Sequence, residues 1–80
     1  MPESLVERRG QYLIDVADAH LLEGHNGEAV ITLQRAESVA PQEVRLSGQV
    51  RGLVRTLLDR ERTGATPGLR ALAERVGATG

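Results

Sequence analysis

Apolar residues recur at spacings of three and four along almost the whole chain, and this spacing restricts it to helices. No stretch alternates apolar and polar residues as a half-buried strand requires. Glycine and proline clusters interrupt the pattern and predict four helical segments, at about residues 3–23, 27–39, 42–62 and 67–76. Because 80 residues leave room for only one core, we expect residues 1–80 to form a single all-α domain.

The glycine and proline positions also predict where helices begin and end. Gly24 suits the left-handed residue after the first helix, and Asn26 suits the N-cap of the second. Pro41 predicts that one helix ends near residue 40 and that another begins at once. Thr66 is expected to cap the last helix. Gly10 interrupts the first segment at a cost of about 1 kcal/mol, which leaves open that residues 1–9 form a separate turn.

Residues 10–43 resemble one tetratricopeptide repeat, in which a short glycine turn joins two helices. The specific part of the match is the spacing of Ala29, Leu33, Ala36 and Pro41. Small residues at such positions let two helices approach closely, and the proline ends the second helix. The chain departs from the repeat pattern at Leu13, Ala17 and His20. The resemblance implies a tetratricopeptide-like helical hairpin, followed by a long helix at 44–63, a linker at 64–68 and a short C-terminal helix at 69–77.

A narrower resemblance extends over about residues 10–77. Four stretches carry it, at residues 14–20, 35–37, 40–45 and 69–77, and the segment Ala-Pro-Gln-Glu-Val-Arg at 40–45 is the most specific. Together they resemble the C-terminal region of a family of actinobacterial transcriptional regulators. Those proteins carry an N-terminal Cro/repressor-type helix-turn-helix and a tetratricopeptide-like sensor region. The resemblance implies that this chain is the end of such a regulator, or a stand-alone relative, without the DNA-binding head.

Composition excludes several classes of function. The chain has no cysteine, which removes disulfides, thiolate metal sites and thiol catalysis. Tyr12 is the only aromatic residue, so no row of rings can stack single-stranded bases. No apolar stretch approaches the roughly 20 residues that cross a bilayer, and the N-terminus lacks the pattern of a signal peptide. We therefore expect a cytoplasmic protein with no membrane partner.

No catalytic or metal-binding constellation is recognisable in the sequence. None of the serines lies in the glycine-flanked elbow of a nucleophile, and no glycine-rich loop is suited to cradle a phosphate. His20 and His25 lie near acidic residues, but histidines five residues apart do not share a helix face, and a turn separates them. We expect no enzyme activity, no cofactor and no metal site.

Charge is unevenly distributed between the two halves of the chain. Residues 1–44 hold eight acids and three arginines, whereas residues 45–80 hold seven arginines and three acids. The stripe of Arg45, Arg51, Arg55 and Arg62 suggests an alternative function, a small DNA-binding regulator. Residues 69–79 resemble the first helix and turn of a helix-turn-helix unit, but the chain ends where the recognition helix would begin. We therefore expect no binding of nucleic acid by this chain alone.

The function that these patterns favour is protein–protein interaction, as the sensor or oligomerisation part of a bacterial transcriptional regulator. Repeat geometry assigns the partner contacts to one side of the first helix, at Gln11, Ile14, Asp18, Leu21 and Leu22. Three of these five residues are apolar, which favours a hydrophobic peptide or a helix as the partner. The alternative is that Leu21 and Leu22 simply pack on the helix that begins near residue 42.

The third segment carries more apolar surface than one neighbouring helix is expected to cover. A second stripe left in water would cost several kcal/mol at about 25 cal/mol per Å², and a two-fold partner would recover it. This predicts a homodimer whose interface contains Leu46, Val50, Leu53, Val54, Leu57 and Leu58. The alternative is that the C-terminal helix folds back and covers the stripe within one chain.

Overall fold

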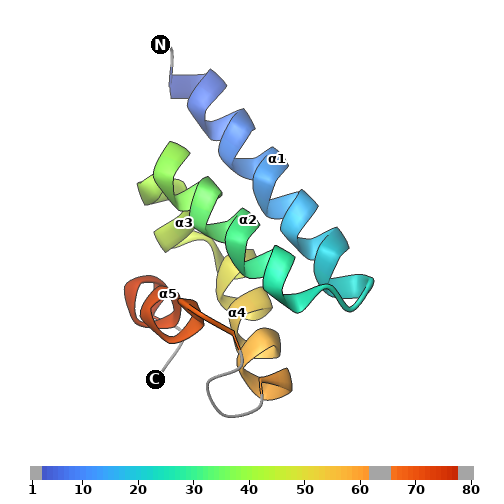
Figure 1. Cartoon of the computed structure of the whole chain (residues 1–80). Helices are drawn as coiled ribbons and strands as arrows, with labels where there is room; N and C mark the ends of the chain where they lie inside the picture. The colour runs from blue at the N-terminus through green and yellow to red at the C-terminus, as the bar shows by residue number, and fades with distance from the viewer. Residues whose placement is uncertain (1–2, 62–65, 78–80) are drawn as a thin grey trace.

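A computed structural model describes residues 3–61 and 66–77, and every regular element among them is a helix. The helices are α1 (Glu3–Leu22), α2 (Asn26–Val39), α3 (Pro41–Leu46), α4 (Gly48–Arg60) and α5 (Leu69–Val76). The all-α class predicted from the sequence is therefore confirmed. α1 and α2 lie side by side and run in opposite directions, with α4 and α5 below them in the view of Figure 1. None of the described helices is long and apolar enough to cross a membrane.

The turn between α1 and α2 is a Schellman motif centred on glycine. Gly24 has a φ of +82°, and its N–H donates to the carbonyl of Leu21 at 3.1 Å. The N–H of His25 donates to the carbonyl of His20 at 2.8 Å, which completes the pair of bonds that defines the motif. The predicted role of Gly24 is thus confirmed. The predicted cap at Asn26 is wrong, because Asn26 is the first residue of α2 and no side chain caps this helix.

α1 and α2 pack through the small residues that the sequence singled out. Ala17, Ala29, Leu33 and Ala36 are buried, and Leu13 packs against the edge of the same core. The separate turn considered for residues 1–9 does not form among its described residues, because α1 runs unbroken from Glu3 through Gly10; residues 1 and 2 lie outside the described part. This glycine is buried, and a Cβ placed on it would lie 2.8 Å from the Cβ of Ala40. Gly10 therefore permits a close approach between α1 and the junction of α2 and α3.

The long helix expected at residues 44–63 is wrong, because the chain breaks at Ser47 into α3 and α4. Ser47 has an extended backbone, and its hydroxyl accepts a hydrogen bond from the N–H of Val50 at 3.2 Å. A serine in this position satisfies a donor at the start of a helix, so it favours a new helix over continuation of the old one. The predicted start near Pro41 is confirmed, since this proline occupies the first turn of α3.

α5 packs against α4, and a turn at residues 66–69 leads into it. The N–H of Leu69 donates to the carbonyl of Thr66 at 3.3 Å, and Gly68 has φ +80° and ψ −9°. These features, with Pro67 before the glycine, are those of a type II turn. Thr66 therefore starts a turn, and the prediction that it caps α5 is wrong, because no side chain caps this helix. α5 ends as predicted at Gly77, which has a φ of +73°. Of the predicted linker, residues 64 and 65 lie outside the described residues.

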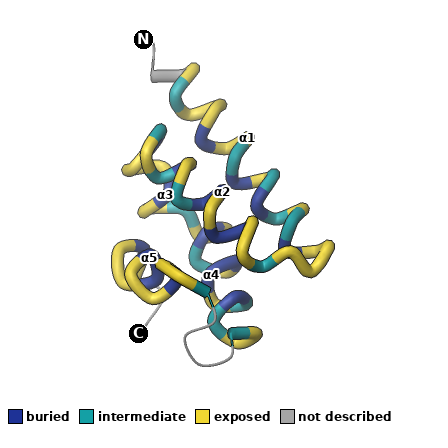
Figure 2. The backbone as a smooth tube through the Cα atoms, in the orientation of Figure 1, coloured by how far each residue is buried: buried dark blue, intermediate teal, exposed yellow. Residues whose placement is uncertain are grey.

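The core is a single cluster to which α1, α2, α3, α4 and α5 all contribute. Buried positions lie on the inner sides of the helices, and exposed positions cover the outside (Figure 2). Its largest fully buried side chains are Ile14, Leu33, Leu57, Leu69, Leu72, Val30, Val44, Val50 and Val54. The core is therefore aliphatic throughout, as a chain with one aromatic residue requires.

Candidate functional site

The five residues predicted to bind a partner do not form one surface. Ile14 and Leu21 are buried in the core, so they are not available to a partner, and their prediction is wrong. Asp18 is half-buried, whereas Gln11 is exposed and Leu22 is 81% exposed. The predicted groove on α1 is therefore filled by the chain itself.

α4 is the element that lies along this side of α1. The side-chain amide of Gln49 on α4 joins Gln11 and Asp15 in a hydrogen-bonded triangle, with distances of 2.9, 3.1 and 3.3 Å. Near the other end of α4, the guanidinium of Arg60 donates to the carbonyl of Leu21 at 2.9 Å. A cation at the last carbonyls of a helix is favourable, because the helix dipole is negative there. Leu21 is buried in the core, whereas Leu22 faces solvent, so the alternative that both residues pack on the helix that begins near residue 42 is wrong for Leu22.

The residues assigned to a dimer interface also belong to the core of one chain. Four of the six are buried, namely Val50, Leu53, Val54 and Leu57. Leu58 is half-buried against the same cluster, and only Leu46 is free, at 78% exposed. α5 folds back onto α4 and contributes Leu69, Leu72 and Val76 to this cluster. The alternative that α5 covers this stripe within one chain is therefore correct. The homodimer remains a prediction, but the buried residues of α4 cannot form its interface.

A different surface of the hairpin is open and hollowed. One hollow of about 480 Å³ is lined by Arg9, Leu13, Ile31, Gln34, Arg35, Ser38 and Val39. A second, of about 430 Å³, is lined by Gly27, Ile31, Gln34, Thr66, Pro67 and Gly68. Because Ile31 and Gln34 line both hollows, we treat the two together as one surface and call it the Ile31 groove. It follows the outer side of α2, from the α1 side to the turn before α5.

The Ile31 groove combines apolar and cationic groups. Ile31 is 51% exposed, and among the exposed large apolar side chains of the described residues it is the one that lines both hollows. Arg9 and Arg35 are exposed at one end of the groove, and neither forms an ion pair with any residue that the structure describes. The groove is thus suited to an apolar side chain accompanied by a negative charge.

The sequence pattern did not predict this groove, because repeat geometry assigned the partner contacts to one side of the first helix. A signal was present at Ile31, which lies between the buried residues Val30 and Thr32 and off the apolar stripe of α2. An isoleucine outside the buried stripe of an amphipathic helix has no core to fill. Ile31 therefore adds apolar area to the surface between the two hollows.

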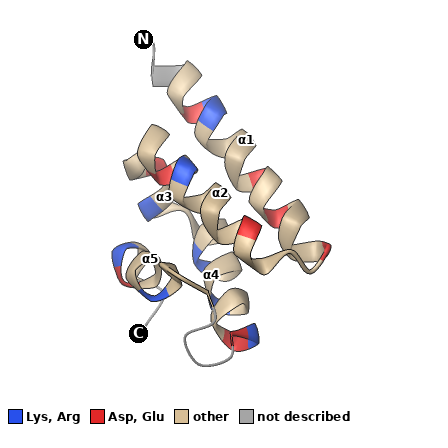
Figure 3. Cartoon of the chain, viewed as in Figure 1, with Lys and Arg blue, Asp and Glu red and all other residues tan. Residues whose placement is uncertain are grey.

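Arg45, one of the arginines that suggested DNA binding, forms an ion pair within the chain, as does Arg75 of the same half. Glu37 on α2 is only 12% exposed, and it accepts two bonds from Arg75 Nε, at 2.8 and 3.0 Å. The same carboxylate lies 3.7 Å from Arg45 Nε. Acidic and basic positions lie close together around α5, as Figure 3 shows. The described arginines of the second half therefore do not form an uninterrupted basic stripe, and Arg62 lies outside the described residues.

Comparison with known proteins gives this geometry no counterpart. No protein-family model, no curated protein and no solved structure matches the chain significantly.

Proposed function

We propose that this chain is a protein-interaction module whose Ile31 groove binds an apolar segment of a protein partner. The observation that carries the proposal is the exposure of Ile31 between two hollows, one of which lies beside two arginines that form no ion pair with the described residues. A large apolar side chain in a concave position gains free energy when a partner covers it, at about 25 cal/mol per Å² of apolar surface.

The charge of the groove defines the partner more closely. Arg9 and Arg35 flank the apolar lining, so a segment with acidic residues beside its apolar anchor is complementary to this surface. An amphipathic helix or a short extended peptide can supply both groups from neighbouring positions. We therefore assign the partner to the class of apolar, acidic peptide segments.

The wider role that we propose is that of a sensor or interaction part of a bacterial transcriptional regulator. The support for it is the sequence resemblance of residues 10–77 to the C-terminal region of such regulators. Direct binding of DNA is the less favoured function, because Arg45, Arg60 and Arg75 already have partners within the chain. An interaction module of this kind acts by binding another protein, or another part of a larger one.

A displayed library of random peptides, selected on the purified chain, tests the proposal. We expect enrichment of peptides that combine apolar and acidic residues. Their affinity should fall at least tenfold in the variant Ile31→Glu, which places a charge at the centre of the groove. The double variant Arg9→Glu/Arg35→Glu should favour peptides with basic residues instead, because it reverses the charge of the rim.

The matched control is Leu22→Glu, which introduces the same charge at an exposed leucine outside the groove. This variant should bind the enriched peptides as the wild type does. Enriched peptides that bind Ile31→Glu as tightly as the wild type, or that lose affinity only in Leu22→Glu, would contradict the assignment of the groove.

A further inference from the structure

The α1–α2 turn brings together two histidines that are five residues apart. In a Schellman motif, the residue after the left-handed glycine lies against the last turn of the helix, and an apolar contact usually forms there. Here those two positions are His25 and His20, and their backbones are joined by the 2.8 Å hydrogen bond of the motif. The two imidazole rings have centroids 6.2 Å apart. The prediction that a turn keeps these histidines apart is therefore wrong, because the turn reverses the chain and pairs them.

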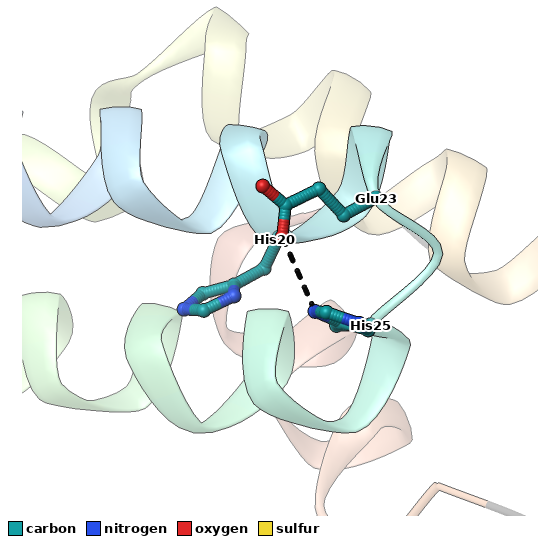
Figure 4. A group of neighbouring side chains, drawn as sticks. All are labelled: His20, Glu23 and His25. Atoms are coloured by element: carbon teal, nitrogen blue, oxygen red, sulfur yellow. Dashed lines mark ion pairs between the residues drawn. The ribbon is translucent and has the colours of Figure 1, made fainter.

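Glu23 adds a third metal-binding group to this pair. One ligand atom from each of His20, Glu23 and His25 can be chosen so that all three lie within 4.8 Å of one another. Glu23 Oε2 and His25 Nδ1 are 3.4 Å apart. Two ligands of a tetrahedral zinc ion are separated by roughly 3.3 Å, given metal–ligand bonds of about 2.0–2.2 Å. Figure 4 shows the three side chains gathered at the end of α1 and the start of α2.

Glu28, in the first turn of α2, supports His20 from the other side. Its Oε2 lies 3.4 Å from His20 Nδ1. A carboxylate beside a ring nitrogen of a histidine helps to orient the ring, as acidic groups commonly do around protein metal sites. The cluster thus contains three ligands and one group that orients a ligand.

We propose that His20, Glu23 and His25 form a binding site for a divalent transition-metal ion, and that this ion is Zn²⁺. Two imidazoles and a carboxylate select zinc and its neighbours over Mg²⁺ and Ca²⁺, which prefer oxygen ligands. The side chain of His20 is 28% exposed, and the side chains of His25 and Glu23 are 54% and 64% exposed, so the ligands can rotate toward an ion. Water fills the remaining coordination position. The site is independent of the Ile31 groove and of the function proposed for it.

Because the ligands come from both sides of the turn, a bound ion ties the end of α1 to the start of α2. An ion that binds only the folded chain raises its thermal stability by mass action. Zinc should therefore raise the melting temperature as well as bind, which provides a second readout.

The test is a titration of the full, tag-free chain with zinc chloride, followed through the imidazole ¹⁵N resonances. The chain contains only two histidines and no cysteine, so every imidazole signal is assignable. We expect one ion per chain, shifts of both imidazoles, and a rise in melting temperature. His25→Gln and Glu23→Gln should each weaken zinc binding at least tenfold and reduce the thermal shift accordingly. Magnesium chloride at the same concentration should give neither effect.

Glu74→Gln is the matched control for Glu23→Gln, because it removes one exposed acid on α5, far from the cluster in the sequence. It should bind zinc as the wild type does. Folding of each variant is checked from its amide spectrum without metal, and His25→Gln is suited to this because His25 is exposed. The proposal is overturned if only one imidazole shifts, if His25→Gln binds zinc as tightly as the wild type, or if zinc at millimolar concentration causes no shift.

Discussion

The two helical pairs of this chain differ in their share of small core residues: three of the seven core residues of α1 and α2 are alanine, against one of the eight of α4 and α5. α1 and α2 meet through Ala17, Ala29 and Ala36, and Gly10 lets α1 approach Ala40 at the end of the pair. The core-facing residues of α4 and α5 are mostly larger: Val50, Leu53, Val54, Leu57, Leu69, Leu72, Ala73 and Val76. Small residues determine how closely two helices approach, whereas branched aliphatic residues supply most of the buried apolar area.

Each pair is therefore sensitive to a different kind of substitution. The α1–α2 pair has little space between its helices, so added atoms should damage it most. The α4–α5 pair depends on the volume of its side chains, so removed atoms should damage it most. Substitutions that add or remove atoms in each pair therefore test the comparison directly.

The largest effect is expected from Leu72→Ala, which removes a fully buried side chain from α5. The loss of apolar contact and the cavity left behind should lower the free energy of unfolding by about 2–5 kcal/mol. Urea denaturation followed by circular dichroism measures it. Leu46→Ala is the control, because Leu46 is 78% exposed and its truncation should cost less than about 0.5 kcal/mol. Equal stability of the two variants would show that α5 does not pack on the core in solution.

Ala29→Leu tests the opposite sensitivity in the first pair. Ala29 is buried on α2, and a larger side chain there should overpack the interface with α1 and destabilise the chain by about 1–3 kcal/mol. Ala71→Leu makes the same change at an exposed alanine of α5, where it should change stability by less than about 0.5 kcal/mol. Thermal melting of both variants is sufficient. Wild-type stability of Ala29→Leu would rule against the register of the hairpin.

Glu37→Gln tests how the two pairs are joined. Glu37 on α2 accepts two hydrogen bonds from Arg75 on α5, and its side chain is only 12% exposed. Because hydrogen bonds between charged groups are stronger than neutral ones, removal of this charge should cost about 1–2 kcal/mol. A double-mutant cycle with Arg75→Gln, read by urea denaturation, isolates the pair. A coupling energy near zero would mean that only apolar contacts connect α5 to α2.

The helices were predictable because their signals are local. The stops at Gly24, Pro41 and Gly77 follow from backbone conformations that one residue type imposes. The break at Ser47 is not predictable from periodicity, because the apolar spacing continues across it. The new helix starts there because the Ser47 hydroxyl accepts a hydrogen bond from the N–H of Val50. Periodicity indicates which faces are apolar, but a side chain that caps a helix overrides it locally.

The candidate sites were not predictable in the same way, because they depend on which faces the chain covers by itself. The apolar stripe of α4 was assigned to a dimer, and α5 covers it through a turn at residues 66–69. The side of α1 assigned to a partner is occupied by α4, through Gln49 and Arg60. His20 and His25 were predicted to lie apart because residues five apart do not share a helix face. That rule holds only inside a helix, and the turn after α1 brings the two residues together.

The smallest effect is expected at Gly52, where a substitution should stabilise the chain. Gly52 lies inside α4, is exposed, and a Cβ on it would contact nothing within 4 Å. Gly52→Ala should therefore stabilise the chain by about 0.5–1 kcal/mol, because alanine favours the helix and lowers the entropy of the unfolded chain.

Gly10→Ala gives the same gain in helix propensity at a site where the close approach of α1 to Ala40 leaves no space. The new Cβ would force the helices apart, so this variant should lose about 1–3 kcal/mol in spite of the better propensity. Thermal melting of the two variants side by side decides the point. If both variants are more stable than the wild type, α1 does not approach Ala40 closely in solution. The first pair would then not be more tightly spaced than the second at this position. Opposite signs would mean that the same substitution is governed by propensity on α4 and by interhelical distance on α1.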